Sequence, residues 1–458
     1  MALVFWIFII PLIASGVLFC FPRRTLAVLM SLIPLMMLVW LATDAVGSSI
    51  SYNWMPSIGV HFSLRMDSIS LLFVYLVAVI IPITLLIVEI APLILALTLV
   101  LQALLFGFFT ARDLALFTFF WEAMLIPLFL MMNISGGEKR KKAAMKFLIY
   151  MIAGSCLMIA AVLGLYFAVG TFSLDSLSTQ SGNIFYAKWI LAIFLLAFAV
   201  KTPLFPFHGW LPDAYYEAST AGTILLAALL SKAGIYGVYR IGIEIFPTIL
   251  REWSPMLLAI AIAGVFYGAL TAWSQKDFKR LIAYSSLSHV NFILVGLFVW
   301  NEAAHSGAIL QAINHGITIT ALFLVVGWLA ERLHFTEIGP VSGLAHFLPY
   351  LCWLTIFFVM ASVALPGTNN FVGELLIFFG VFKENPWLAA FLSLMIILSA
   401  MYMLRWVQDV YFEEPSFFQQ SWVDISAKEF VIALPLVILI LWIGLYPAPI
   451  LKLIEMRG

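Results

Sequence analysis

Long apolar stretches recur along nearly the whole chain, and each is close to the length that an α-helix needs to cross a bilayer. Short polar connections separate them, with no linker long enough to divide two domains. The pattern predicts an all-α polytopic membrane protein of about fourteen transmembrane helices. The expected spans lie approximately at residues 2–20, 25–43, 66–88, 91–109, 113–132, 144–168, 186–205, 218–240, 255–273, 281–299, 304–330, 347–380, 387–411 and 429–451.

Proline and glycine interrupt two of these spans. Residues 201–208 carry two prolines at the end of the seventh span, and residues 365–370 (Leu-Pro-Gly-Thr-Asn-Asn) lie within the twelfth. Proline removes a backbone donor, so an unwound segment at such a break must face protein or water rather than lipid. Ordinary proline kinks are the alternative. Two broken spans about five helices apart indicate internal repeats, with the working site at the breaks.

The repeats divide the chain into four predicted parts. They are N-terminal helices at 1–90, a first five-helix repeat at 91–245, a second five-helix repeat at 250–412 and a C-terminal helix at 425–458.

Composition agrees with a membrane protein and excludes several other classes. Of the 458 residues, 64% are hydrophobic and only 10% are charged, too few for a soluble chain of this length. The net charge is zero, so no nucleic-acid partner is indicated. Cys20, Cys156 and Cys352 are far apart, which excludes a CxxC redox centre or a multi-cysteine iron–sulfur site within the chain.

Lysine and arginine gather in the connections that follow odd-numbered spans, most densely at residues 139–142. Because cytoplasmic loops are enriched in these residues, both termini are predicted on the non-cytoplasmic side of an inner (cytoplasmic) membrane. The run at 2–20 has no basic segment before it and no small-residue cleavage site, so we expect it to be a retained first span.

Ionisable residues within the apolar runs are the main candidates for chemistry. A charge near the bilayer centre costs about 2.5–3.5 kcal/mol on insertion scales, so such residues usually serve a pathway or a pair. Glu122 has no basic neighbour in sequence, and Lys201 is its natural partner. A static ion pair is one interpretation; in the other, a change in the Glu–Lys separation loads or unloads a proton on Lys201. Lys232 has no local counter-ion and suits a proton relay.

Two histidines and a second glutamate extend this set. His289 and His315 lie within the tenth and eleventh spans, and Glu374 follows the break in the twelfth. Histidine titrates near neutral pH and can pass protons, although each one singly also fits a hydrogen-bonded core histidine. His208 and Asp213, in the connection after the seventh span, are candidates for proton uptake from the cytoplasmic side. Acid, base and imidazole spread over eight spans are hard to explain by packing alone.

The segments around these residues resemble the antiporter-like subunits of respiratory complex I, over roughly residues 60–450. The motifs that carry the resemblance are Trp121-Glu-Ala-Met-Leu-Ile-Pro127, Lys201-Thr-Pro-Leu-Phe-Pro-Phe-His-Gly-Trp-Leu-Pro-Asp213, Leu281-Ile-Ala-Tyr-Ser-Ser-Leu-Ser-His289, Ile313-Asn-His-Gly316 and Leu365-Pro-Gly-Thr-Asn-Asn-Phe-Val-Gly-Glu374. The resemblance implies 14 helices, two inverted five-helix repeats that each form a half-channel, and a mid-membrane proton path. It implies that Glu122 and Lys201 form the family's Glu–Lys pair and that Lys232 is its central lysine. His289 and His315 would be the connecting residues of the proton path, and Glu374 the terminal residue of the second half-channel.

Within that family the sequence is most similar to the M-type branch. Glu374 stands where the L- and N-type branches usually carry lysine, and we expect no long lateral helix of the L-type kind after the last span. The connection around Glu89–Pro92 is shorter than is usual in the family.

The resemblance implies a proton-translocating membrane-arm subunit of an NADH:quinone oxidoreductase. The chain has no nucleotide or cluster motif, so NADH, FMN, iron–sulfur clusters and quinone are expected in other subunits, with no cofactor here. The expected partners are the L-type and N-type subunits and the lipid bilayer. The alternatives are a subunit of a multisubunit cation/proton antiporter or membrane-bound hydrogenase, and a purely structural anchor.

Overall fold

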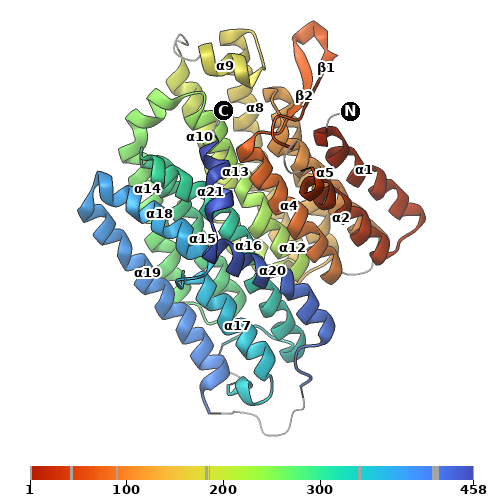
Figure 1. Cartoon of the computed structure of the whole chain (residues 1–458), viewed down its shortest axis with the longest axis vertical. Coiled ribbons are helices and arrows are strands. Elements are labelled where there is room, and N and C mark those ends of the chain that lie inside the picture. The colour runs from red at the N-terminus through yellow and green to blue at the C-terminus, as the bar shows by residue number, and fades with distance from the viewer. Residues whose placement is uncertain are drawn as a thin grey trace. The chain divides into compact units, whose positions relative to one another are not determined.

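The computed structural model describes residues 3–41, 45–88, 91–180, 184, 186–338, 342–414 and 422–456, and helices make up most of it (Figure 1). Contacts divide the chain into two compact units. Unit 1 comprises Met1–Thr202, Glu217–Trp253 and Leu453–Gly458, and unit 2 comprises Pro203–Tyr216 and Ser254–Lys452. The all-α membrane class is therefore confirmed for the described residues.

Unit 1 holds most of the elements of the N-terminal half. They are α1 (Leu3–Cys20), α2 (Arg24–Trp40), β1 (Ser49–Met55), η1 (Pro56–Ile58), β2 (Val60–Arg65), α4 (Ser68–Ile87), α5 (Pro92–Thr110), α6 (Leu114–Ala123), α7 (Leu125–Ile134), α8 (Arg140–Val169), α9 (Leu174–Gln180), α10 (Ala187–Lys201), α12 (Thr220–Ile224), η3 (Leu225–Leu230), α13 (Ser231–Gly237) and η4 (Val238–Ile243). Helix α5 lies inside the protein, since almost every one of its residues is buried.

The remaining elements belong mainly to unit 2. They are α11 (Leu211–Glu217), α14 (Pro247–Trp273), α15 (Phe278–Phe298), α16 (Glu302–Leu333), η5 (Leu344–His346), α17 (Pro349–Ser362), α18 (Asn369–Glu384), α19 (Pro386–Val407), η6 (Gln408–Phe412), α20 (Ala427–Leu445) and α21 (Ala448–Glu455). Helix α16 is the centre of this unit, because its apolar span is buried along its whole length.

Eleven helices among the described residues are at least 18 residues long and apolar enough to cross a membrane. The count of about fourteen stays a prediction, because the spans expected at 25–43, 186–205 and 347–380 correspond to shorter helices. Two of these three are the spans that the sequence predicts to be broken. The short connection at Glu89–Pro92 includes two residues, 89 and 90, that lie outside the described part of the chain.

Both predicted breaks are present. Helix α10 ends at Lys201, just before the two prolines, and a turn region leads to α11. In the twelfth span, α17 ends at Ser362 and α18 begins at Asn369, with Gly367 at φ 92° between them. A Cβ on Gly444 of α20 would lie 2.3 Å from the Gly367 carbonyl oxygen. This unwound backbone therefore packs against protein, as a break inside a membrane requires.

The connection between α2 and α4 contains a β-hairpin that the sequence analysis did not foresee. Strands β1 and β2 pair antiparallel from Ser49 opposite Arg65 to Met55 opposite Val60, and Gly59 closes the turn at φ 71°. Asp67 then caps α4: its side chain accepts from the Ser70 amide, and the Ser70 hydroxyl accepts from the Asp67 amide. This capping box fixes where the helix begins.

Candidate functional site

Glu122 lies beside a local break in its span. The Asp113 side chain caps α6 by accepting from the amides of Ala115 and Leu116, and the helix ends at Ala123, one residue after Glu122. Pro127 explains this end, because proline has no N–H to donate to the carbonyl four residues earlier. Glu122 is only partly buried, but its Oε1 atom is buried and has no hydrogen-bond partner within the described chain.

Lys201 is buried at the last position of α10. Its Nζ donates to the Trp121 carbonyl oxygen at 2.8 Å and lies 3.6 Å from the centroid of the Trp121 ring. It is therefore held by the residue next to Glu122, and Glu122 acts on it electrostatically. No ion pair within 4.0 Å joins the two among the residues that the structure describes. The lysine and the carboxylate therefore interact electrostatically at a separation beyond 4.0 Å.

Lys232 lies in a short α-helical segment, α13, between two π-helical segments, η3 and η4. Its side chain is fully buried, and Nζ donates to the Ala227 carbonyl at 2.9 Å and contacts the Ser231 hydroxyl oxygen at 3.3 Å. π-Helical segments are rare and occur frequently at functional sites. Here they flank the one charged residue in the middle of a fully buried span.

Two glycines bring the helix of Lys232 against the helix of Lys201. A Cβ on Gly234 would lie 1.8 Å from the Thr202 Oγ1, and a Cβ on Gly237 would lie 2.6 Å from the Phe198 ring. Only glycine permits so close an approach of α13 to the end of α10. This packing sets the spacing of the two buried lysines within unit 1.

In unit 2 the structure brings His289 and Glu374 together. His289 Nδ1 and Glu374 Oε1 are 3.2 Å apart, and both side chains are about 95% buried. This distance fits an ion pair when the imidazole is protonated, although the angles are not those of a hydrogen bond. The same Glu374 oxygen accepts from Gln311 Nε2 at 3.3 Å. Glu374 therefore has one titratable and one neutral neighbour.

His315 and an asparagine pair complete this cluster. The His289 and His315 rings are 6.0 Å apart, and both residues are buried. Asn314 Nδ2 donates to the Asn369 carbonyl at 2.7 Å, and Asn369 Nδ2 donates to the Asn314 carbonyl at 3.1 Å. The two amides join α16 to the first turn of α18, directly after the break. They hold the helix that carries Glu374 against the helix that carries Gln311 and His315.

The two candidates for proton uptake lie in unit 2. His208 is buried, with its ring 5.6 Å from Phe205 and 4.7 Å from Tyr267. Asp213, on α11, lies 3.7 Å from the Arg280 guanidinium, and both side chains are over one third exposed. The structure thus groups Glu122, Lys201 and Lys232 in unit 1, and His208, Asp213, His289, His315 and Glu374 in unit 2.

No group of three or more His, Cys, Asp or Glu side chains that would hold a metal occurs among the described residues.

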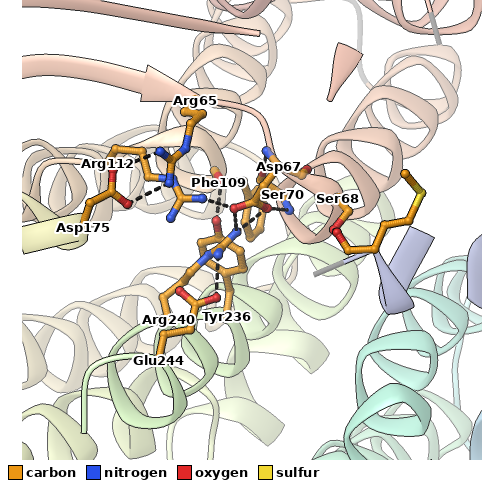
Figure 2. A network of polar contacts seen from close by, with 11 residues as sticks. Arg65, Asp67, Ser68, Ser70, Phe109, Arg112, Asp175, Tyr236, Arg240 and Glu244 are labelled. Carbon is orange, nitrogen blue, oxygen red and sulfur yellow. Dashed lines mark hydrogen bonds and ion pairs between the residues drawn. The ribbon is translucent and has the colours of Figure 1, made fainter. Parts of the chain in front are cut away.

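One ionic network in unit 1 was missed by the sequence analysis (Figure 2). Asp67 accepts from Arg112 and, at 2.5 and 2.6 Å, from Arg240, whose other nitrogen donates to Glu244 at 2.8 Å. Beside it, Arg65 forms a forked pair with Asp175 at 2.7 and 3.0 Å. Burial raises the pKa of Asp67, but Arg240 and Arg112 outweigh it and lower this pKa to about 2.

Comparison with known proteins places the chain in a family. The sequence model described as "NADH:quinone oxidoreductase/Mrp antiporter, TM" matches residues 111–416. The chain belongs to this family. It is 36% identical to NADH-quinone oxidoreductase subunit M of Rickettsia prowazekii, over 88% of this chain and 84% of that one, and 38% identical to subunit M of Rhodobacter capsulatus, over 86% and 81%.

A solved structure agrees with this assignment. A chain of respiratory complex I from Thermus thermophilus with bound NADH matches with a TM-score of 0.91 and 33% identity, covering 99% of this chain and 98% of that one. The predicted resemblance to the antiporter-like family is therefore confirmed, and the chain is a multi-pass membrane protein of that family.

Proposed function

We propose that this chain is the M-type, proton-translocating subunit of an NADH:quinone oxidoreductase. In the proposed mechanism, redox energy from other subunits changes the Glu122–Lys201 separation and thereby the proton affinity of Lys201. The proton moves to Lys232 and is carried further by His289, His315 and Glu374. Moving one charge against 100 mV takes about 2.3 kcal/mol. A change of roughly two in the pKa of the proton-carrying group supplies this free energy.

The observation that carries the proposal is the set of polar contacts around ionisable groups inside apolar helices. Lys201 bonds to a backbone carbonyl next to Glu122, and Lys232 bonds to the carbonyl of Ala227. Glu374 lies between an imidazole and an amide. The two lysines therefore donate to neutral backbone carbonyls, and Glu374 lies beside a histidine whose charge depends on its protonation.

The proposal includes an arrangement in the membrane. Two inverted repeats at 91–245 and 250–412 form the half-channels, with His208 and Asp213 at proton uptake and both termini on the non-cytoplasmic face of the inner membrane. L-type and N-type subunits are the neighbours. NADH, FMN, iron–sulfur clusters and quinone bind to other subunits, so the residues of this chain hold and move protons only.

Substitution of Glu122 tests the proposal. Glu122→Gln keeps the side-chain size and removes the charge, so NADH-driven proton pumping in inverted vesicles is expected to fall strongly, while Glu122→Asp retains part of it. The matched control is Glu252→Gln, which removes an exposed carboxylate that pairs with Lys188 at 2.6 Å on the surface of the same unit. Pumping by Glu122→Gln at the wild-type rate would contradict the proposed role of the pair.

The family description supports one further candidate, a subunit of a cation/proton antiporter. An antiporter exchanges sodium for protons in vesicles without NADH, whereas the proposed function needs electron transfer. Sodium-driven proton exchange by the purified assembly, independent of NADH, would favour this second function. A purely structural anchor predicts that Glu122→Gln changes neither activity.

A further inference from the structure

Five aromatic rings lie side by side in unit 1, and we name them the aromatic layer: Phe73, Phe108, Phe109, Phe117 and Tyr236. Phe73 and Phe109 stack at 5.0 Å, Tyr236 meets the edge of Phe109 at 5.0 Å, and Phe108 lies 4.4 Å from Phe117. Each of these residues is at most 2% exposed. Four different helical segments, α4, α5, α6 and α13, contribute to the layer.

The layer lies between the buried lysines and one end of unit 1. With a rise of about 1.5 Å per residue, the residues of the layer lie within about 11 Å of the end of their span, which for Tyr236 is the end of η4. Lys232 lies about 17 Å from that same end. On its inner side the layer continues into Trp121, whose ring is 5.9 Å from Phe108 and carries the Lys201 ammonium. The Lys201 site therefore borders the layer directly.

The ionic network of Figure 2 closes the outer side. Tyr236 donates from its hydroxyl to the Phe109 carbonyl at 2.5 Å, and the Arg240 guanidinium lies 4.9 Å from its ring. Asp67 holds Arg240 and Arg112 in place. Three segments of the chain also meet here, since the Arg112 amide donates to the Ser63 carbonyl of β2, and the Arg112 carbonyl accepts from the amide of Leu174 at the start of α9. Ionic contacts and hydrogen bonds therefore hold the segments at this end of unit 1 together.

The aromatic rings, the Tyr236 hydroxyl and the two guanidinium groups do not suit proton passage. Aromatic carbons offer no hydrogen bonds to a water chain, and apolar constrictions in membrane proteins exclude water. Tyr236 directs its proton to a backbone carbonyl, which does not pass it on. Arginine stays protonated at any physiological pH, and a fixed guanidinium repels hydrated protons.

We propose that the aromatic layer, fastened by the Arg240–Asp67–Arg112 network, is a proton seal that closes unit 1 at this end. The inference rests on the proposed function, because a seal matters only if Lys201 and Lys232 carry protons. The predicted topology places the sealed end on the non-cytoplasmic side. Protons on the lysines therefore do not return directly to that side and stay committed to the path through His289 and Glu374.

Passive proton leak tests the seal without any electron transfer. The intact complex is reconstituted in liposomes with an internal pH dye, and a potassium diffusion potential is imposed with valinomycin in the absence of NADH. Phe109→Ala opens the centre of the layer and is expected to raise the proton leak severalfold. Adding Lys232→Leu to this variant is expected to remove most of the extra leak, since the route then lacks its carrier.

Phe172→Ala is the matched control. Phe172 is a buried aromatic residue of the same unit that stacks on Tyr166 at 4.3 Å, outside the layer. The proton leak of the Phe172→Ala complex is therefore expected to equal that of the wild type. Should Phe109→Ala fail to assemble, Phe117→Leu opens the layer more mildly and is expected to leak as well. A wild-type leak in the assembled layer variants, or an equal leak in Phe172→Ala, would overturn the seal.

The outcomes separate this inference from the function on which it rests. If Lys232→Leu alone leaves protons pumped per electron unchanged, the proposed function fails, whatever the leak shows. If Lys232→Leu abolishes pumping while the proton leak of Phe109→Ala equals that of the wild type, the proposed function stands and the proposed seal is wrong. An extra leak that Lys232→Leu does not reduce also overturns the seal, because that leak bypasses the lysines.

Discussion

Substitution of Gly234 by alanine addresses the spacing of the two buried lysines. The new Cβ would lie 1.8 Å from the Thr202 Oγ1, 2.9 Å from the Thr202 amide nitrogen and 3.0 Å from the Phe198 carbonyl oxygen. Two of these neighbours are backbone atoms, so a side-chain rotation alone does not relieve the contact. The segment that carries Lys232 has to move away from the end of α10, where Lys201 is located.

The size of the effect follows from this geometry. Overpacking of a dense interior costs about 1–3 kcal/mol, which a large protein tolerates. Misplacement of a reacting group by about 1 Å can cost on the order of 100-fold in rate. We therefore expect Gly234→Ala to assemble, but to lower NADH-driven proton pumping by about 10- to 100-fold. Pumping and NADH oxidation are measured together in inverted membrane vesicles.

Two further variants test whether this contact sets the position of Lys232. Gly164→Ala places the same methyl group 3.6 Å from Ile190 of α10, an ordinary contact, and should pump normally. Thr202→Ala removes the nearest clashing atom, which makes no hydrogen bond within the described chain, and should partly rescue Gly234→Ala. Wild-type pumping by Gly234→Ala, or no gain from the second substitution, would refute the idea that this packing sets the lysine spacing.

Three other substitutions probe separate parts of the molecule. Glu374→Gln keeps the bond to Gln311 but removes the charge beside His289, so protons pumped per electron should fall while complex assembly, judged on native gels, stays normal. Asp67→Asn should lower the free energy of unfolding by about 2 kcal/mol at pH 7, because the pKa of Asp67 is about 2 instead of 3.8. This difference should shrink as pH falls from about 4 to 2, where the wild-type carboxylate also becomes protonated; chemical unfolding at both pH values measures it. Asn369→Ala removes the two hydrogen bonds of the Asn369 side chain, from its Nδ2 to the Asn314 carbonyl and from the Thr318 hydroxyl to its Oδ1. This loss should cost about 2–3 kcal/mol, seen as a lower midpoint of thermal unfolding.

The sequence predicts those features that depend on local chemistry. Proline and glycine mark both helix breaks, and a charge inside an apolar run marks a position where lipid contact is costly, which singles out residues such as Lys232 and Glu374. The contact of His289 with Glu374 needs the fold as well, since the two lie on different helices. The sequence predicts that His289 and Glu374 belong to one proton path, but it does not give the distance between them.

Other features carry little or no local signal. Asp67, Arg112 and the i,i+4 pair Arg240–Glu244 come from three separate parts of the chain, so only the folded chain brings them together. The π-helical segments around Lys232 depend on packing and have no sequence pattern of their own. The hairpin at 49–65 did have a signal: apolar Ile50, Tyr52 and Trp54 alternate with polar residues before a Pro-Ser-Ile-Gly turn, as in a strand pair. This alternation covers only a few residues between two long apolar spans, so it is a weak signal beside the signal for transmembrane helices.

The number of protons pumped per electron by a Lys232→Ala variant shows whether this buried lysine carries protons. The intact complex is reconstituted in liposomes, NADH oxidation and proton uptake are recorded together, and the variant is compared with Lys188→Ala, which removes an exposed lysine of the same unit. We expect a lower proton-to-electron ratio for Lys232→Ala and a wild-type ratio for Lys188→Ala. A fully assembled Lys232→Ala complex with the wild-type ratio would contradict it.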